Sequence, residues 1–245
     1  MSTAIVITSG KGGTGKTSIT GGVASCLAAL GHRVLCIDMD IGLRNLDISL
    51  GLTDRALMDF TDVAQGICDL DDAVAAHPRI PGLYLLTAPV RLSSQAVTTE
   101  QMRALLRQVR GRFDYCLLDA PAGLGTGFQL ATCSADACVV VTCTDASSLR
   151  DAQRTVEELY RIRQVHLVMN RIQPKLLRQL RTTIDDAMDT AGLPLLGVVP
   201  EDPQVMLSAN LGRPLILGGR QGAANACLNI AKRLEGRRVP IMRIR

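Results

Sequence analysis

The most informative stretch of this sequence is Ser9-Gly10-Lys11-Gly12-Gly13-Thr14-Gly15-Lys16-Thr17-Ser18. Its residues 10–17 fit the phosphate-binding loop pattern G-x-x-x-x-G-K-[ST]. The β-branched run 5–7 before it predicts a buried strand, and apolar residues recur at helical spacing from Ile19 to Leu30 after it. The loop is therefore expected between a strand and a helix. This context separates a phosphate loop from a glycine-rich turn that matches the pattern by chance.

The residue types in this loop predict binding of a nucleoside triphosphate. Glycines allow successive backbone N–H groups to surround an anion, and the start of the following helix adds unpaired donors and partial positive charge. Lys16 would reach the β- and γ-phosphates, and the Thr17 hydroxyl would ligate Mg²⁺. The loop residues assigned to nucleotide binding are Gly10, Lys11, Gly12, Gly13, Thr14, Gly15, Lys16, Thr17 and Ser18.

Length and composition limit the class of protein. With 245 residues the chain is most economically one α/β domain, expected over residues 1–236, with a short basic tail at 237–245. Hydrophobic residues make up 47% of the chain and aromatic residues 2%, so the core must be aliphatic. A net charge of +4 does not by itself indicate a nucleic-acid partner.

The eight cysteines indicate a reducing compartment. None forms a C-x-x-C pair, and most lie in apolar runs, where a free thiol behaves as a small hydrophobe. We expect buried thiols rather than a metal site, although Cys133, Cys138 and Cys143 are evenly spaced. Unpaired thiols, no recognisable signal peptide and no apolar run near ~20 residues favour a cytoplasmic location.

Carboxylates follow two of the predicted strands. Asp38 and Asp40 come after the apolar run 34–37, and Asp119 ends the run 115–118 in the Walker B pattern. Asp38 could hold a metal-bound water, and Asp40 could orient the attacking water. Asp119 could accept a hydrogen bond from a Mg²⁺-bound water or from Thr17. Two turn aspartates without a chemical role are the alternative at positions 38 and 40.

Seven predicted strands alternate with helices, which indicates a doubly wound, mostly parallel sheet with helices on both faces. The strands are expected at about residues 3–8, 33–38, 83–87, 114–119, 137–142, 165–169 and 195–199. The phosphate loop, the three aspartates and Asn170 all follow strand ends, so they are expected to meet in one crevice. The amide of Asn170 could pair with a purine edge there.

Shorter patterns predict individual helix ends. A helix is expected from Ala56 to Val63, and another from Ala223 to Leu234. Thr98 with Gln101 fits a capping box, and Ser147 or Ser148 could cap the helix that follows them. The histidines His32 and His77 sit beside turn residues and have no obvious acidic partner in the sequence.

Lys11 adds a second lysine to the phosphate loop, so that residues 11–17 read K-G-G-T-G-K-T. This resembles the deviant Walker A motif of the ParA/MinD family of ATPases, in which the additional lysine crosses a dimer interface to the partner's nucleotide. Residues 38–47, which read D-M-D-I-G-L-R-N-L-D, closely resemble the switch I signature of the MinD branch. Residues 119–129 resemble its switch II, with Ala120 where serine is usual. No cysteine lies in that loop, which counts against a nitrogenase iron-protein.

The resemblance covers about residues 3–235 and implies a role for further positions. The expected catalytic residues are Lys11, Lys16 and Asp40, and the expected metal site is Thr17, Asp38 and Asp119, partly through water. The base would be held by Asn170, Arg171, Pro200 and Asp202. The switch positions are Gly42, Asn45, Pro121 and Gly123. The family's partner surface would include Arg150 and Asp151, although each could equally be a solvated charge.

The function implied is a slow Mg²⁺-dependent ATPase that forms a homodimer on ATP and helps to position the division septum. A division-inhibitor protein and an ATPase-stimulating protein would be its partners. Related ATPases that place flagella or segregate DNA are the alternative, with DNA less favoured because the net charge is only +4. An iron–sulfur carrier would require paired surface cysteines, and a small-molecule kinase would require a lid and an acceptor site.

The tail Arg237-Arg238-Val239-Pro240-Ile241-Met242-Arg243-Ile244-Arg245 combines arginines with large apolar residues. Members of the MinD branch usually close with an amphipathic helix that lies on the membrane, and such a helix needs a basic face and an apolar face. Pro240 interrupts this tail, so one copy offers little apolar area, although a dimer doubles it. We therefore expect reversible binding to the inner face of the cell membrane by a cytoplasmic protein. The alternatives are that the tail is cut short or that this homologue works differently.

Overall fold

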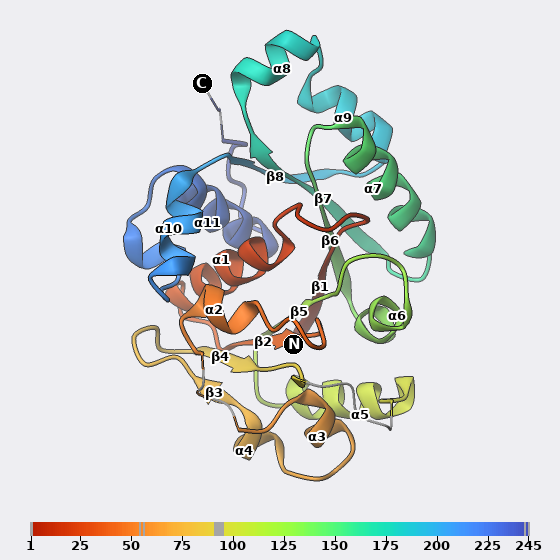
Figure 1. The fold of residues 1–245 in the computed structure, drawn as a ribbon, viewed down its shortest axis with the longest axis vertical. Helices are drawn as coiled ribbons and strands as arrows, with labels where there is room; N and C mark the ends of the chain where they lie inside the picture. The colour runs from red at the N-terminus through yellow and green to blue at the C-terminus, as the bar shows by residue number, and fades with distance from the viewer. Residues whose placement is uncertain (1, 54, 56, 91–95, 243, 245) are drawn as a thin grey trace.

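The computed structural model of the chain describes residues 2–53, 55, 57–90, 96–242 and 244. Its centre is an eight-stranded sheet in the order β3-β4-β2-β5-β1-β6-β7-β8 (Figure 1). Neighbouring strands run parallel, apart from β3, which pairs antiparallel with β4. The strands are β1 (Thr3–Thr8), β2 (Val34–Asp38), β3 (Ala75–Ala76), β4 (Leu83–Leu86), β5 (Tyr115–Asp119), β6 (Ala137–Thr142), β7 (Gln164–Ile172) and β8 (Leu195–Pro200).

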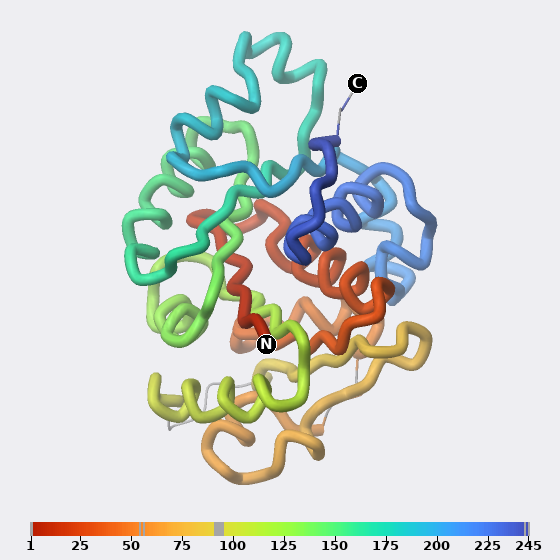
Figure 2. The backbone as a smooth tube through the Cα atoms, turned by 180° about the vertical axis from the view of Figure 1, so that it is seen from behind, coloured from red at the N-terminus to blue at the C-terminus, as the bar shows by residue number. Residues whose placement is uncertain are grey.

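Helices cover both faces of this sheet, so the predicted doubly wound fold is confirmed (Figures 1 and 2). Helices α1, α2 and α11 supply the core on one face, and α3 to α7 with α9 supply it on the other. The helices are α1 (Lys16–Ala29), α2 (Leu46–Leu50), α3 (Phe60–Ala64), α4 (Leu70–Ala73), α5 (Thr99–Arg110), α6 (Thr126–Thr132), α7 (Ala146–Glu158), α8 (Pro174–Leu180), α9 (Ile184–Ala191), α10 (Pro203–Asn210), the 3-10 helix η1 (Leu215–Gly218) and α11 (Gly222–Leu234).

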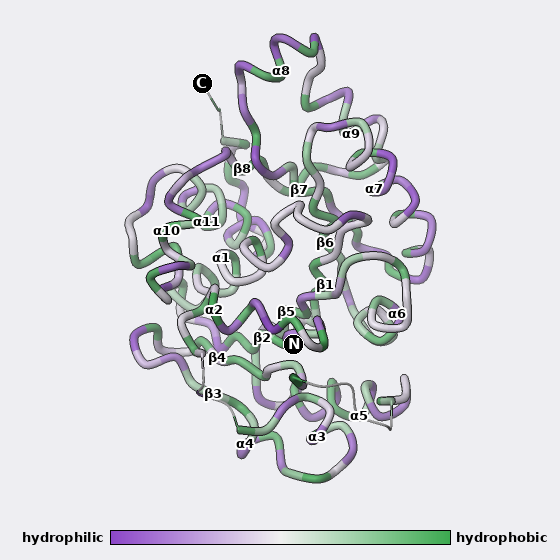
Figure 3. Tube along the Cα trace, in the orientation of Figure 1, coloured by the Kyte–Doolittle hydropathy of each residue, from purple (hydrophilic) through white to green (hydrophobic). Residues whose placement is uncertain are grey.

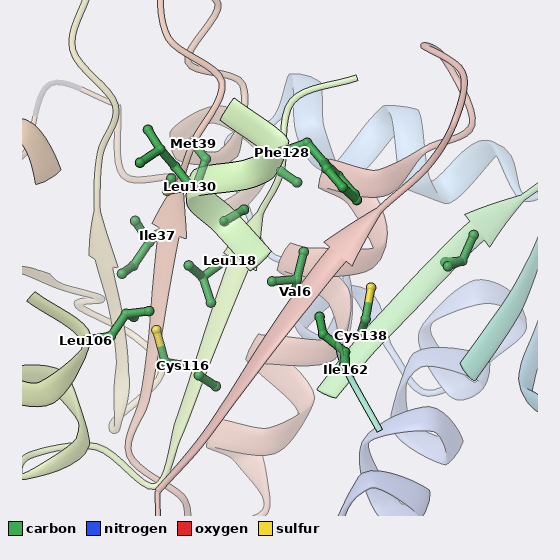
Figure 4. Packing of buried hydrophobic residues seen from close by; sticks show 14 of the residues in the cluster. Val6, Ile37, Met39, Leu106, Cys116, Leu118, Phe128, Leu130, Cys138 and Ile162 are labelled. Carbon is green, nitrogen blue, oxygen red and sulfur yellow. The ribbon is translucent and has the colours of Figure 1, made fainter. Parts of the chain in front are cut away.

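The two cores follow from the alternation of side chains along each strand. Val6 and Leu118 point to the face covered by α5 and α6, whereas Ile5 and Leu117 point to the face covered by α1 and α11. Figure 4 shows Phe128 of α6 close to Val6 in the first of these cores. All four strand residues are at most 1% exposed, so these central strands are apolar on both sides, as expected for a buried parallel sheet.

The cysteines take part in this packing as small apolar side chains. Cys116 and Cys138 lie inside the core shown in Figure 4, and both are at most 1% exposed. All eight cysteines are free, and burial raises the pKa of the Cys116 thiol to about 12. Cys68, Cys133 and Cys143 are half-buried. With a pKa this high, the Cys116 thiol stays protonated at neutral pH and is not a nucleophile.

Three of the predicted helix ends can be compared with the structure. The capping box of Thr98 and Gln101 is present at the start of α5. The helix expected from Ala56 begins only at Phe60, because Asp59 forms a capping box with Asp62; Ala56 itself lies outside the described residues. The cap of α7 is not a serine but Asp145, which accepts from the N–H of Ser148 at 2.9 Å.

The sequence-based strands agree with the structure within a residue or so, except that β3 was not expected and β7 extends to Ile172. β3 is a two-residue strand at the sheet edge, too short for an alternation pattern to be recognised. Within the described residues, no helix has both the length and the apolar character needed to cross a bilayer.

Candidate functional site

The phosphate loop leads from β1 into α1. Gly13 and Gly15 have φ angles of 83° and 89°, in the left-handed region that strains any residue with a Cβ. Gly15 caps α1, and its carbonyl accepts from the N–H of Ile19 at 3.0 Å. Lys16 is the first helical residue and is only 9% exposed. A buried ammonium and unpaired N–H groups at a helix start form a site suited to an anion.

The three predicted metal ligands lie together beside this loop. Asp119 ends β5 and accepts hydrogen bonds from Oγ1 of Thr17 at 2.7 Å and Oγ1 of Thr20 at 2.8 Å. Asp38 ends β2 directly opposite Asp119 in the parallel register. Both carboxylates are 1% exposed. Thr20 was missed from the sequence, although it lies one helical turn beyond Thr17 and could have been included on that spacing.

Burial dominates the electrostatics of this carboxylate pair. It raises the pKa of Asp119 to about 7, with the Asp38 charge acting in the same direction and the hydrogen bonds from Thr17 and Thr20 acting against it. Burial likewise raises the pKa of Asp38 to about 6, against hydrogen bonds from the N–H groups of Asp40 and Leu46. Two buried carboxylates that resist ionisation are a fitting pair for a divalent cation, because the cation supplies the positive charge they lack.

Asp38 also ties the following loop to the sheet. Its two carboxylate oxygens accept from the N–H of Asp40 at 2.9 Å and from the N–H of Leu46, at the start of α2, at 3.1 Å. Gly42, at a φ of 89°, donates its N–H to the carbonyl of Pro89 at 3.1 Å. The Asp38 carboxylate thus holds residues 40–45 at both ends of the loop. A movement of this carboxylate would therefore also move the loop.

A crevice of about 790 Å³ lies at the C-terminal edge of the sheet and contains most of the predicted site. Met206, Val205 and Leu215 give it an apolar wall that suits a planar base, and these residues were not predicted. The predicted residues that do not line it are Gly10, Lys11, Thr14, Asp38, Gly42, Asp119, Pro121, Gly123, Arg150 and Asp151. The predicted residues that do line it are Gly12, Gly13, Gly15, Lys16, Thr17, Ser18, Asp40, Asn45, Asn170, Arg171, Pro200 and Asp202.

Asn170 and Arg171 connect the end of β7 to the phosphate loop. Asn170 is 7% exposed and donates its amide Nδ2 to the carbonyl of Thr14 at 2.8 Å. Arg171 donates Nη1 to the carbonyl of Gly13 at 3.2 Å and Nε to Glu201 at 3.1 Å. The end of β7 and the phosphate loop are therefore joined by direct hydrogen bonds.

The loop after β5 borders the crevice on the other side. Ala120 is 1% exposed and donates its N–H to the carbonyl of Ile7 at 3.0 Å, so the alanine found there instead of serine keeps a backbone contact. Ala122 lines the crevice, and Gly123 adopts a φ of 85°. Pro121 packs close to Gly127, where an added Cβ would lie 2.5 Å from the proline ring. Pro121 and Gly123 are thus placed on a tight turn.

Lys11 lies outside the crevice and contacts α7 of its own chain. Its Nζ donates to Oγ of Ser147 at 2.8 Å and is 3.5 Å from a carboxylate oxygen of Asp145. Partial burial opposes ionisation of Asp145, but hydrogen bonds from Ser147 and Ser148, together with the Lys11 charge, hold its pKa below the usual range. Side chains of Lys11 and Asp145 are about half exposed, at 46% and 51%, so this contact is weak and can be exchanged.

The phosphate loop also packs against the backbone of α7. A Cβ added to Gly10 would lie 2.2 Å from the carbonyl oxygen of Asp151, so only glycine fits at position 10. Arg150 is exposed and Asp151 half-buried beside this contact. The first half of α7 therefore lies against the loop at both Gly10 and Lys11.

The family model described as "CobQ/CobB/MinD/ParA nucleotide binding domain" matches residues 5–215. The chain belongs to the ParA/MinD family. Among curated relatives in the family, the septum site-determining protein MinD of Synechocystis is 38% identical over 99% of this chain and 92% of its own length. The MinD of Bacillus subtilis is 39% identical over 98% of this chain and 92% of its own length.

Solved structures of the family agree with this assignment. MinD from the MinC:MinD complex of Aquifex aeolicus matches with a TM-score of 0.91 at 35% identity, over 99% of each chain. MinD of Pyrococcus horikoshii, solved with Mg-ADP, matches with a TM-score of 0.84 at 28% identity, over 96% of each chain. A ParA family ATPase of Chlorobium tepidum, at 20% identity and a TM-score of 0.81, shares the fold alone.

The raised carboxylate pKa values lead to a testable pH dependence. Between its ordinary pKa and about 7, Asp119 binds more protons in the folded than in the unfolded chain, so without metal this group favours folding at low pH. That contribution is lost as pH rises through about 7, at a cost on the order of 2–4 kcal/mol. We expect Asp119→Asn to unfold at a higher temperature than the parent at about pH 8 in EDTA, with a smaller difference at about pH 5.

The measurement is thermal unfolding followed by circular dichroism in EDTA and then in excess Mg²⁺. Added Mg²⁺ should raise the unfolding temperature of the parent at about pH 8 and leave Asp119→Asn nearly unchanged. The exposed Asp69→Asn is the matched control and should behave as the parent. Parallel pH profiles for the parent and Asp119→Asn would show that the carboxylate is ionised at no cost in the folded chain.

Proposed function

We propose that this chain is a Mg²⁺-dependent ATPase that dimerises on ATP and helps to position the cell-division septum. The observation that carries the proposal is the link between the crevice and the buried carboxylate pair. Thr17 of the phosphate loop lines the crevice and donates a hydrogen bond to Asp119, which lies opposite Asp38. Membership of the ParA/MinD family and 38–39% identity to curated MinD proteins over nearly the whole chain support the biological role.

In the proposed cycle, the loop from Gly12 to Ser18 binds the phosphates, with Lys16 on the β- and γ-phosphates. Thr17, Asp38 and Asp119 would hold Mg²⁺, partly through water, and the ion would supply positive charge against the phosphates. Asn170, Arg171, Pro200 and Asp202 hold the base. The crevice already carries a wall of apolar side chains at that end, which supports this orientation of the nucleotide.

Dimerisation would depend on ATP because Lys11 of each subunit would reach the nucleotide of the other. Two lysines that meet across an interface repel one another unless anions lie between them. Lys11 would exchange its weak contact with Ser147 for the phosphates of the partner's nucleotide. Hydrolysis by a water oriented by Asp40 would remove the γ-phosphate and separate the pair.

The proposed partners are a second copy of the chain, a division inhibitor and an ATPase-stimulating protein. The Aquifex aeolicus MinC:MinD complex supports the inhibitor, because its MinD subunit is 35% identical to this chain. Arg150 and Asp151 on α7 are proposed to face such a partner. The protein would be cytoplasmic and would bind reversibly to an anionic membrane on the inner face of the cell envelope.

The function is tested by removing the protein from its cell and by capture in vitro. Loss should move septa away from their normal position without loss of DNA segregation, and a MinC-type inhibitor should bind the purified chain with ATP but not with ADP. Normal septa combined with lost plasmids or misplaced flagella would contradict the proposal. The ATPase would then segregate DNA or place flagella instead of positioning the septum.

A further inference from the structure

Helix α8, which combines hydrophilic and hydrophobic residues (Figure 3), differs from the other α-helices of the described chain because none of its residues is fully buried. Leu176 and Leu180 are 39% and 53% exposed, and they share one face because they are four residues apart. Only Leu177 and Pro174 turn toward the body of the protein. Figures 1 and 2 both show α8 at one extreme end of the molecule, beyond the sheet. Water is an unfavourable surrounding for this pair of leucines.

The same helix carries positive charge that is not neutralised. Lys175, Arg178 and Arg181 are exposed, and none lies within ion-pair distance of a carboxylate in the described part of the chain. By contrast, Arg171 just before the helix is paired with Glu201 at 3.1 Å. Acidic residues return only at the start of α9, where Asp186 is engaged in a capping box with Thr183.

The C-terminal tail lies beside α8. Arg233 of α11 donates Nε to the carbonyl of Val239 at 3.0 Å and Nη1 to the carbonyl of Leu196 at 2.7 Å, which holds the tail against β8. A groove of about 560 Å³ separates the tail from α8. Aliphatic residues of both segments line it: Ile172, Pro174, Leu177, Ile184, Ile241, Met242 and Ile244. Arg238 is exposed at the start of this segment.

We propose that α8 and the tail form one surface, here called the α8–tail face, that binds an anionic lipid bilayer. The proposal rests on the membrane binding proposed above and adds a folded element, α8, to the tail. Leu176 and Leu180 would enter the interface, and Lys175, Arg178 and Arg181 would contact lipid phosphates. The aliphatic groove between the two segments would accept acyl chain.

The composition of the face favours a bilayer over DNA. Both ligands present phosphates, and basic side chains alone would suit either one. Exposed leucines gain nothing from a phosphate backbone, whereas in a bilayer their side chains leave water, which is favourable for every CH₂ group that is buried. The face combines both requirements of an interfacial element, an apolar stripe and flanking positive charge. Two copies in a dimer would multiply a weak individual affinity.

The experiment is sedimentation of the full chain with ATP and Mg²⁺ on phosphatidylglycerol-containing vesicles, with neutral phosphatidylcholine vesicles and duplex DNA as parallel probes. We expect Leu176→Ser/Leu180→Ser to weaken binding to the anionic vesicles about tenfold or more. Lys175→Gln/Arg178→Gln should weaken it by about fivefold per charge and reduce its salt dependence. The matched control, Leu57→Ser/Arg107→Gln, changes an exposed leucine and an exposed arginine elsewhere and should bind as the parent.

The outcomes separate this inference from the proposed function. Parent binding to anionic vesicles with equal binding of the α8 variants would overturn the role of α8 and leave membrane binding intact. No vesicle binding by the parent would overturn both. Loss of DNA binding by the α8 variants, with vesicle binding unchanged, would assign the face to DNA instead. ATPase activity in the absence of vesicles should be the same in all variants, which verifies that each one is folded.

Discussion

Replacement of Lys11 by alanine is expected to abolish ATP-dependent dimerisation and to lower ATP hydrolysis about 100- to 1,000-fold. The reason is that a cation supplied from across an interface stabilises the charge that develops on the transferred phosphoryl group, an effect of this size or larger in related switches. ATP binding to the single chain should survive, because Lys16 and the loop N–H groups remain. The measurements are light scattering on a sizing column with ATP and Mg²⁺, phosphate release, and nucleotide affinity.

The contact of Lys11 with α7 supplies the decisive control. Asp145→Asn removes the charge that Lys11 faces within its own chain but keeps a side chain that can cap α7. If Lys11 acts across the dimer, Asp145→Asn should dimerise at least as well as the parent. If Lys11 only steadies α7, both variants should lose activity together. Lys175→Ala, which removes another exposed lysine, should leave dimerisation and hydrolysis in solution unchanged.

The sheet and its binding edge could be predicted because their signals are local. Apolar runs identified seven of the eight strands in the described residues, and Asp38, Asp119 and Asn170 each follow one of those runs directly. A carboxylate at the C-terminal end of a parallel strand must lie at the same edge of the sheet as the ends of the neighbouring strands. Asp38 and Asp119 therefore stand opposite each other in the structure, although 81 positions separate them in the chain.

Contacts between distant segments could not be predicted in this way. His32 was expected to lack an acidic partner, and this was wrong. Its Nε2 lies 2.5 Å from a carboxylate oxygen of Glu235, 203 residues away. The contacts of Lys11 with α7 and the hydrogen bond from Asn170 to Thr14 could not be predicted either. Sequence periodicity identifies strands and helices, but it does not indicate which of the connecting loops contact one another. The apolar wall of the crevice comes from α10 and η1, and no sequence pattern had assigned their residues to the site.

Helix caps show how local signals can also mislead. Ser147 and Ser148 are good capping types, but Asp145 takes the position because its carboxylate accepts from the N–H of Ser148 and from both serine hydroxyls. The carboxylate is the stronger acceptor, and it also faces Lys11. The identity of this cap matters for function, since it places a negative charge beside the phosphate loop.

Replacement of Asp40 by alanine should have the opposite consequence for the dimer from loss of Lys11. Asp40 lines the crevice, half-buried, and its N–H is fixed by the carboxylate of Asp38 at 2.9 Å. It makes none of the contacts proposed to hold phosphate, metal or base. We therefore expect hydrolysis to fall about 100- to 10,000-fold, the range for loss of a residue that positions or activates the nucleophile, with ATP affinity nearly unchanged.

A chain that binds ATP but does not hydrolyse it should accumulate as the dimer, because the γ-phosphate that draws the subunits together is no longer removed. On a sizing column with ATP and Mg²⁺, Asp40→Ala should remain dimeric for far longer than the parent, while Asp40→Ala combined with Lys11→Ala should be monomeric. Asp69→Ala, at an exposed position outside the crevice, is the control for loss of a carboxylate. A monomeric Asp40→Ala with normal ATP affinity would mean that Asp40 helps to build the interface, and the attacking water would then need a different partner.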